Sequence, residues 1–154
     1  MDDVGKLRAI PLFTELRTDA LERLAGVARH ESHPKGARVF AEGEPGQSMY
    51  FIEAGRVRIS KELPGMGEEA LAILGPGSVF GEMAVLDGSR RSATAIVHED
   101  VELLVIDGEA FDRLLSVDKE LAYVVLRAMT RTLAGRLRET TDKLMTVFLM
   151  SQFG

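Results

Sequence analysis

The sequence contains no cysteine. That absence excludes disulfide bonds, thiolate zinc sites, cysteine-ligated iron–sulfur clusters and thiol nucleophiles, and it fits a reducing compartment. A long apolar run is also missing, because no stretch approaches the roughly 20 residues that are needed to span a bilayer. The N-terminal residues lack the basic start and the apolar core of a secretory signal. We therefore expect a cytoplasmic protein with no membrane partner.

Basic residues are outnumbered by acidic ones. The chain has 19 lysines and arginines against 24 aspartates and glutamates, which gives a formal net charge of −5. Such a molecule has no general attraction for the phosphates of nucleic acid, so any anion that it binds must be held by a local site. The length of 154 residues suits one domain with its own core, and we expect a single domain over residues 1–154.

The distribution of apolar residues divides the chain into three regions. Residues 1–29 carry apolar side chains at helical spacing, which predicts short N-terminal helices. Residues 30–107 consist of short alternating or β-branched runs separated by turn sequences such as EGEPGQ. Residues 108–154 return to a helical pattern, with a long helix expected at about 119–150. We therefore predict a mainly β fold with flanking helices, in which a β-barrel or jelly roll lies between short N-terminal helices and a long C-terminal helix.

The segment EAGRVRIS predicts a change of direction within the β region. Ala54 and Gly55 are typical of a tight turn. Val57 and Ile59 alternate after them, as they would on one face of a strand. We therefore expect one strand to end before this turn and a second strand to run back after it.

The long C-terminal helix carries a heptad seam. Its members follow one another at alternating steps of four and three residues: Leu126, Thr130, Leu133, Leu137, Thr140, Leu144 and Val147. A helix of this length spans about 45 Å, at 1.5 Å per residue, and so extends beyond a small domain. We therefore expect part of the seam to meet a second copy in a homodimer. The alternative is that the seam packs on the barrel.

Two further sets of residues lie beside the seam. A second apolar face, available to pack on the barrel, consists of Val125, Met129, Thr132 and Phe148. A basic set occupies flanking and outer heptad positions and consists of Arg127, Arg131, Arg136, Arg138 and Lys143. We expect these basic side chains to be solvated, as on a coiled-coil flank, rather than to contact nucleic acid.

The stretch FGEMAVLDGSRRSATAIV, from Phe80 to Val97, combines residues that suit an anionic sugar ligand. Gly81 and Glu82 precede a short apolar run that predicts a turn of helix, whose first backbone N–H groups favour an anion. Arg91 follows and has the planar guanidinium that holds two phosphate oxygens at once. Glu82 is suited to accept hydrogen bonds from sugar hydroxyls. A cyclic phosphodiester on a ribose meets both demands.

These residues resemble a known motif. FGEMAVLDGSRRSA resembles the phosphate-binding cassette of the cyclic-nucleotide-binding domain family, of the type found in catabolite activators and protein kinase A regulatory subunits. The matching positions are Phe80, Gly81, Glu82, Ala84, Arg91, Ser92 and Ala93. The earlier segment GEPGQSMYFIEAG, residues 43–55, resembles the glycine-punctuated strand and turn of the same family. The resemblance covers nearly the whole chain, because it includes these two motifs, in this order, and the helices that flank them.

The resemblance implies a role for each site residue. Glu82 would bind the ribose 2′-hydroxyl, Arg91 would bind the exocyclic phosphate oxygens, and Ser92 would place a hydroxyl near the phosphate or the base. The backbone of Gly81 and of Met83 or Ala84 would complete the phosphate cradle. Ala93 belongs to the same cassette. In catabolite activators two adjacent hydroxyl residues of the long helix contact the base, one from each subunit. Thr140 and Thr141 occupy the matching positions.

We therefore predict a sensor that binds a cyclic nucleotide and couples binding to the position of its C-terminal helix. Cyclic AMP is the preferred ligand, because relatives that select guanine often have threonine where this chain has Ser92. Cyclic GMP stays an alternative, as does a nucleotide-independent dimeric interaction module.

Other functions are weighed against this prediction. His30, His33 and His98 are too scattered for a hydrolase, so we expect neither catalysis nor a metal. A haem-based sensor, with His98 as the candidate ligand, is a further alternative. Too few residues follow the long helix to form a DNA-reading motif, so we expect no direct DNA binding and a downstream protein effector of unknown identity.

Overall fold

The structure, a computed structural model, describes residues 2–153. Its helices are α1 (Asp3–Ala9), the short 3-10 helix η1 (Pro11–Phe13), α2 (Thr18–Val27), α3 (Glu82–Asp87), α4 (Gly108–Val117) and α5 (Lys119–Phe153). Its strands are β1 (Ala28–His33), β2 (Arg38–Phe40), β3 (Ser48–Leu63), β4 (Gly67–Leu74), β5 (Val79–Phe80) and β6 (Thr94–Asp107). Short helices thus precede the strands, and a long helix follows them.

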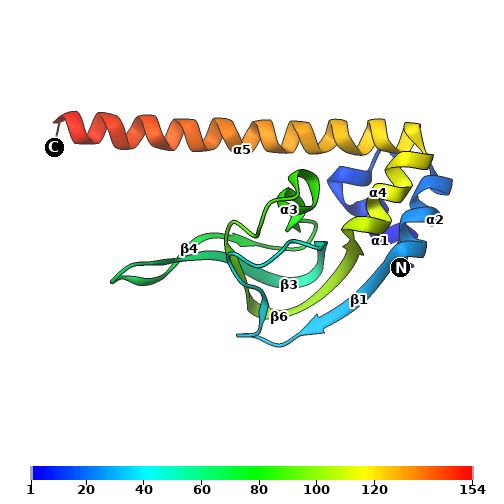
Figure 1. The fold of residues 1–154 in the computed structure, drawn as a ribbon, viewed down its shortest axis with the longest axis horizontal. Coiled ribbons are helices and arrows are strands. Elements are labelled where there is room, and N and C mark those ends of the chain that lie inside the picture. Colours follow the sequence, from blue (N-terminus) through cyan, green and yellow to red (C-terminus); the bar gives the residue numbers. More distant parts are fainter. Residues whose placement is uncertain (1, 154) are drawn as a thin grey trace.

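A 6-stranded antiparallel sheet forms the body of the protein. Its strand order is β1-β6-β3-β4, while β2 pairs with β6 and β5 pairs with β3. The helices α1, α2 and α4 gather at one end of the curled sheet, α3 lies between the strands and α5, and α5 runs along one side of the molecule (Figure 1). The predicted fold class, mainly β with flanking helices and a long C-terminal helix, is confirmed. That residues 1–154 make up a single domain stays a prediction.

Apolar side chains gather in two buried clusters. One cluster lies inside the curved sheet and includes Val57 and Val97, both fully buried. The other lies between the sheet and the helices, where the rings of Phe13 and Phe51 have their centroids 5.2 Å apart. The helices therefore pack directly on the sheet, because the second cluster combines helix residues with strand residues such as Phe51.

The predicted tight turn at Ala54 and Gly55 is wrong. β3 continues through both residues and pairs with β6 from Ser48 to Ser60, with register shifts on either side of Ala54. Gly55 has a φ of +83°, and a Cβ built there would lie 2.0 Å from the carbonyl oxygen of Asp100. The glycine therefore forms an irregularity that bends a continuous strand and lets β6 approach, instead of reversing the chain.

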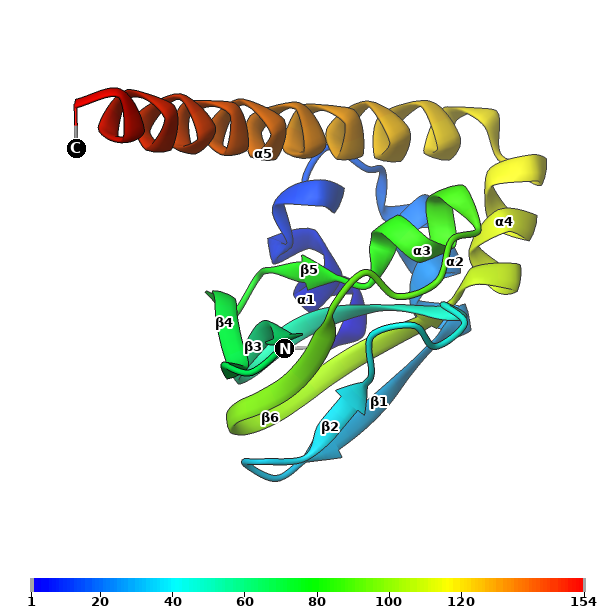
Figure 2. The same cartoon turned by 60° about the vertical axis from the view of Figure 1, so that its left-hand side comes forward.

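The helix α5 is packed at its beginning and projects from the body at its end, as Figure 2 also shows. Leu121, Val125 and Met129 are buried in the cluster that holds the N-terminal helices. Phe148, which the sequence places on the same apolar face, is 56% exposed. The expectation that this residue packs on the barrel is wrong, because α5 has left the body at that point.

The heptad seam of α5 is exposed over its outer part. Leu137, Leu144 and Val147 are 67%, 65% and 63% exposed. These values contradict the alternative in which this part of the seam packs on the barrel. The length of α5 does not make it a membrane helix, because no helix within residues 2–153 is both long enough and apolar enough to cross a bilayer.

Replacing Gly55 tests the bend in β3. Gly55→Ala is expected to lower the free energy of unfolding by about 3 kcal/mol or more, because it adds a steric clash with the Asp100 carbonyl to the cost of a left-handed backbone. Gly65→Ala is the control, since Gly65 has a φ of +76° but open space around it. This control should cost about 1 kcal/mol in urea denaturation. Equal losses for the two variants would contradict the close approach of β6.

Candidate functional site

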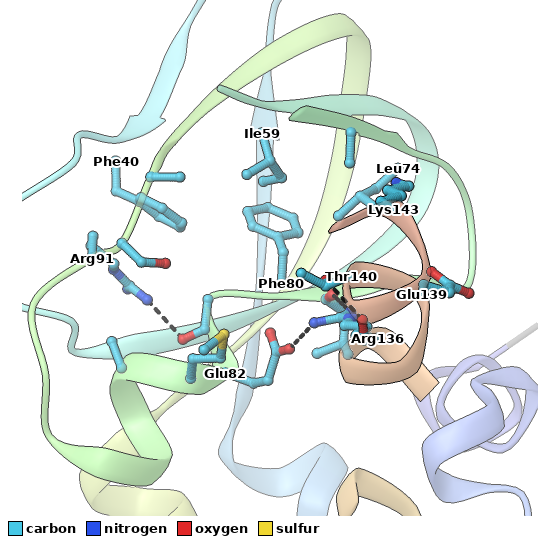
Figure 3. Close-up of a pocket in the computed structure, with 17 residues that line it drawn as sticks. Phe40, Ile59, Leu74, Phe80, Glu82, Arg91, Arg136, Glu139, Thr140 and Lys143 are labelled. Atoms are coloured by element: carbon cyan, nitrogen blue, oxygen red, sulfur yellow. Dashed lines mark hydrogen bonds and ion pairs between the residues drawn. The ribbon is translucent and has the colours of Figure 1, made fainter. Parts of the chain in front are cut away.

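A cavity of about 380 Å³ lies between α3, α5 and the strands (Figure 3). Its apolar wall comes from the strands and consists of Phe40, Ile59, Ala72, Leu74, Val79 and Phe80. The rest of the lining comes from the start of α3, the loop after it and α5, and consists of Gly81, Glu82, Met83, Ala84, Arg91, Ser92, Ala93, Arg136, Glu139, Thr140 and Lys143. Such a lining suits a ligand with a flat apolar part and a charged end.

The start of α3 is held close to the loop that precedes β3. Gly81 has a left-handed backbone, with a φ of +79°, and precedes the first residue of α3, Glu82. A Cβ at Gly46 would lie 2.1 Å from the Cβ of Ala84, so only glycine lets these two segments touch. This contact fixes the position of α3, and therefore of Glu82, relative to the sheet.

Arg91 is a buried cation that forms no ion pair with any carboxylate of residues 2–153. The residue is 5% exposed, and its Nη1 and Nη2 donate to the carbonyl oxygens of Gly81 and Ser48, both at 2.8 Å. Its Nε is buried and has no hydrogen-bond partner among the described residues. Burial lowers the pKa of the Arg91 guanidinium, although the charges of Tyr50, Glu44 and Glu82 act in the opposite direction. An anion in the cavity would offset the cost of this buried charge.

Glu82 is also buried, but its charge is paired. Its side chain is 5% exposed, and Oε1 accepts a hydrogen bond from Nη1 of Arg136 at 2.5 Å. Nη2 of Arg136 lies 3.5 Å from the carbonyl oxygen of Val79. Figure 3 shows Glu82 pointing toward Arg136, with Arg91 on its other side. One carboxylate thus joins the cavity floor to the long helix.

The role of Arg136 was not predicted from the sequence. Arg136 was expected to be solvated on a coiled-coil flank, and that prediction is wrong because its guanidinium contacts the buried carboxylate of Glu82. The available signal was helical spacing. Residues 136, 139, 140 and 143 follow one another at intervals that share one helix face, and Thr140 was already assigned to the site.

The structure brings together all the predicted site residues except one. Every cassette residue that was singled out lines the cavity, and so does Thr140. The hydroxyl of Thr140 donates to the carbonyl oxygen of Arg136 at 2.9 Å, which leaves its oxygen able to accept a further hydrogen bond. Thr141 is exposed on α5 and does not belong to the lining. The ligand contacts of these residues stay predictions.

Other chemistry finds little support in this part of the chain. His98 does not line the cavity, which removes the geometric basis for a haem ligand there. Within residues 2–153, no three histidine, aspartate or glutamate side chains gather in a way that would hold a metal ion. The lining instead presents the buried guanidinium of Arg91 and the buried carboxylate of Glu82.

Comparison with known proteins places this cavity in a family. The model of the cyclic nucleotide-binding domain matches residues 30–118, which include Glu82 and Arg91. The chain is 35% identical over 133 residues to the cyclic AMP receptor protein of Thermus thermophilus, covering 86% of this chain and 60% of that protein. It is 31% identical over 144 residues to a CRP-like cAMP-activated global transcriptional regulator of Mycobacterium tuberculosis, covering 94% of this chain and 62% of that protein.

A solved structure agrees with these sequence relatives. The crystal structure of a cyclic nucleotide-binding domain from Methylobacillus flagellatus has a TM-score of 0.80 and 26% identity, and the match covers 93% of this chain and 80% of that one. The chain spans about three fifths of the length of the two sequence relatives. Because the family model matches more than half of the residues, the chain belongs to the cyclic nucleotide-binding domain family.

Proposed function

We propose that this protein is a sensor for cyclic AMP that reports binding through the position of α5. The buried guanidinium of Arg91 is the observation that carries the proposal. No described carboxylate neutralises it, so a phosphate in the cavity gains a charge-assisted hydrogen bond and also relieves a buried, unpaired cation. A neutral ligand would not form the charge-assisted hydrogen bond and would not compensate the buried charge.

The cavity accommodates the parts of a cyclic nucleotide in order. The guanidinium of Arg91 and the hydroxyl of Ser92 bind the phosphate. The backbone of Gly81 and of Met83 or Ala84 surrounds the same phosphate, and Ala93 lines the cavity next to Ser92. Glu82 accepts from the ribose 2′-hydroxyl. The base then extends along the apolar wall toward α5, where Thr140 lies on the lining. Each assignment is supported by the shared cavity and by the family's cassette.

Cyclic AMP is preferred over cyclic GMP on two grounds. Both sequence relatives described above are named for cyclic AMP. Ser92 follows the cassette arginine, where relatives that select guanine often carry threonine. Cyclic GMP is the second candidate, because a serine hydroxyl also reaches hydrogen-bonding groups on guanine.

The contact between Glu82 and Arg136 supports coupling to the helix. The ribose 2′-hydroxyl and the guanidinium of Arg136 both donate to the carboxylate of Glu82, and an ionised carboxylate has lone pairs for more than one donor. A ligand that binds Glu82 therefore alters the energy of the contact that holds the middle of α5 to the sheet. Binding shifts the population toward the helix position that serves both contacts best. The protein acts in this scheme as a binding module and not as an enzyme.

The exposed seam supports a homodimer. Leu137, Leu144 and Val147 form an apolar stripe that a second copy of α5 would cover. In a parallel pair of helices, the exposed Thr141 of the second copy lies near the first copy's cavity and completes the base site. The signal then passes to a protein effector in the cytoplasm.

Calorimetric titration tests the ligand and the role of Arg91. The parent is expected to bind cyclic AMP more tightly than cyclic GMP. Arg91→Leu should weaken cyclic AMP binding by about 30-fold or more, because the phosphate loses its buried partner. Arg90→Leu is the matched control, since the exposed Arg90 donates only to the carbonyl oxygen of Gly43 and should leave the affinity unchanged. Equal heats for the parent and Arg91→Leu would show that the phosphate site lies elsewhere.

Substitution of Arg136 tests the link between the cavity and α5. Arg136→Met should lower the free energy of unfolding by about 1 to 3 kcal/mol without ligand, because it leaves the buried carboxylate of Glu82 without its cation. Arg138→Met, two residues further along and on the opposite side of the helix, should have little effect because Arg138 is exposed. Hydrogen exchange of α5 should respond to cyclic AMP in the parent and in Arg138→Met, but much less in Arg136→Met. An unchanged response in Arg136→Met would refute the link.

Charged residues on the seam test the homodimer. Sedimentation is expected to show a dimer for the parent and a monomer for Leu137→Asp combined with Leu144→Asp, because two charges would be buried in the seam. The monomer should bind cyclic AMP more weakly, since it lacks Thr141 of the second copy. A parent that stays monomeric at high concentration with nucleotide bound would contradict the shared site.

A further inference from the structure

Arg91 lies against an aromatic ring instead of an acid. Its Cζ atom is 4.1 Å from the centroid of the Phe40 ring and 5.7 Å from that of Tyr50. The face of an aromatic ring carries negative charge density and attracts a cation, most strongly where water is excluded. Both the guanidinium and Phe40 are buried. The ring therefore provides part of the compensation that a carboxylate would otherwise give.

The backbone holds Phe40 and Arg91 in register. The N–H of Gly43 donates to the carbonyl oxygen of Arg91 at 2.9 Å, and the N–H of Arg91 donates to the carbonyl oxygen of Glu44 at 2.8 Å. These reciprocal bonds tie the loop that follows β2 to the loop that precedes β6. Phe40 is the last residue of β2, so the ladder sets where its ring meets the guanidinium.

The ring of Phe40 is itself fixed by neighbours. Its centroid lies 5.8 Å from that of Tyr50 and 5.9 Å from that of Phe80, and the last two rings stack at 5.1 Å. Packed aromatic side chains of this kind have little rotamer freedom. The position of the Arg91 guanidinium is thus set by a closely packed ring and by the carbonyl oxygens of Gly81 and Ser48.

We propose that Phe40 is a positioning residue of the anion site, which acts by holding the guanidinium of Arg91 in place while leaving its charge available. A carboxylate in the same position would hold Arg91 equally well, but it would neutralise the charge and compete with the phosphate. A ring face attracts the cation without accepting the hydrogen bonds that the ligand needs. This inference rests on the proposed function, in that the anion is the phosphate of a cyclic nucleotide.

Affinity for cyclic AMP gives the first test. Phe40→Leu and Phe40→Met, two replacements of different shape that lack a ring, should each weaken binding by about five- to thirtyfold. An affinity within twofold of the parent for both variants would overturn the proposal. Either variant suffices if the other does not fold.

Unfolding without nucleotide separates positioning from wall packing. The shift in urea midpoint caused by Phe40→Leu is measured in two backgrounds, the parent and Arg91→Leu. The shift caused by Phe80→Leu is measured in the same two backgrounds. Phe80 lines the same cavity and belongs to the same ring cluster, but it has no cation contact with Arg91. Phe40→Leu should shift the midpoint less when Arg91 is already gone, whereas the shift from Phe80→Leu should be the same in both backgrounds.

The two possible failures give different results. Equal shifts from Phe40→Leu with and without Arg91 would show that Phe40 is only part of the cavity wall, and the proposal would fall. A parent that binds neither cyclic AMP nor cyclic GMP would refute the proposed function, while the unfolding measurements would still decide whether Phe40 holds Arg91.

Discussion

The site depends on the buried guanidinium of Arg91, which forms no ion pair with a carboxylate among the described residues. Taking a charge out of water costs several kcal/mol unless other groups replace the lost solvation. For Arg91 the replacements are the carbonyl oxygens of Gly81 and Ser48 and the ring of Phe40. All of these attract the cation, and none of them cancels its charge. The fold therefore holds a positive charge in the cavity lining, where it would interact strongly with an anion.

The two buried charges of the site differ in how they are satisfied. Arg91 is held by dipoles and a ring, while Glu82 is held by the full charge of Arg136. The first arrangement leaves the charge of Arg91 without an ion-pair partner among the described residues. The second ties the carboxylate of Glu82 to α5. Under the proposed function, a ligand donor that approaches Glu82 would share the carboxylate with α5, and this one side chain would link binding to helix position.

The helix α5 serves three purposes on separate parts of its surface. Its first turns are buried with the N-terminal helices through Leu121, Val125 and Met129. Its middle turns present Arg136 and Thr140 to the cavity. Its outer turns leave the heptad seam exposed. The three parts follow one another along the helix, and Thr140 belongs both to the cavity lining and to the seam.

The sequence by itself determined the fold class and the cassette residues that line the cavity. Strand and helix periods are local properties, and the residues from Gly81 to Ala93 lie in one short segment, so adjacent positions were enough to identify them. Tertiary structure alone decided three other features. The pairing of β3 with β6 kept the strand continuous through Gly55. Arg136 met Glu82 across 54 positions of sequence. Phe40 met Arg91 because separate loops are bonded together. Each of these contacts depends on elements that become neighbours only when the sheet closes and α5 packs beside it. Helical spacing places Arg136 on the same face as Thr140, but it does not specify the contact with Glu82.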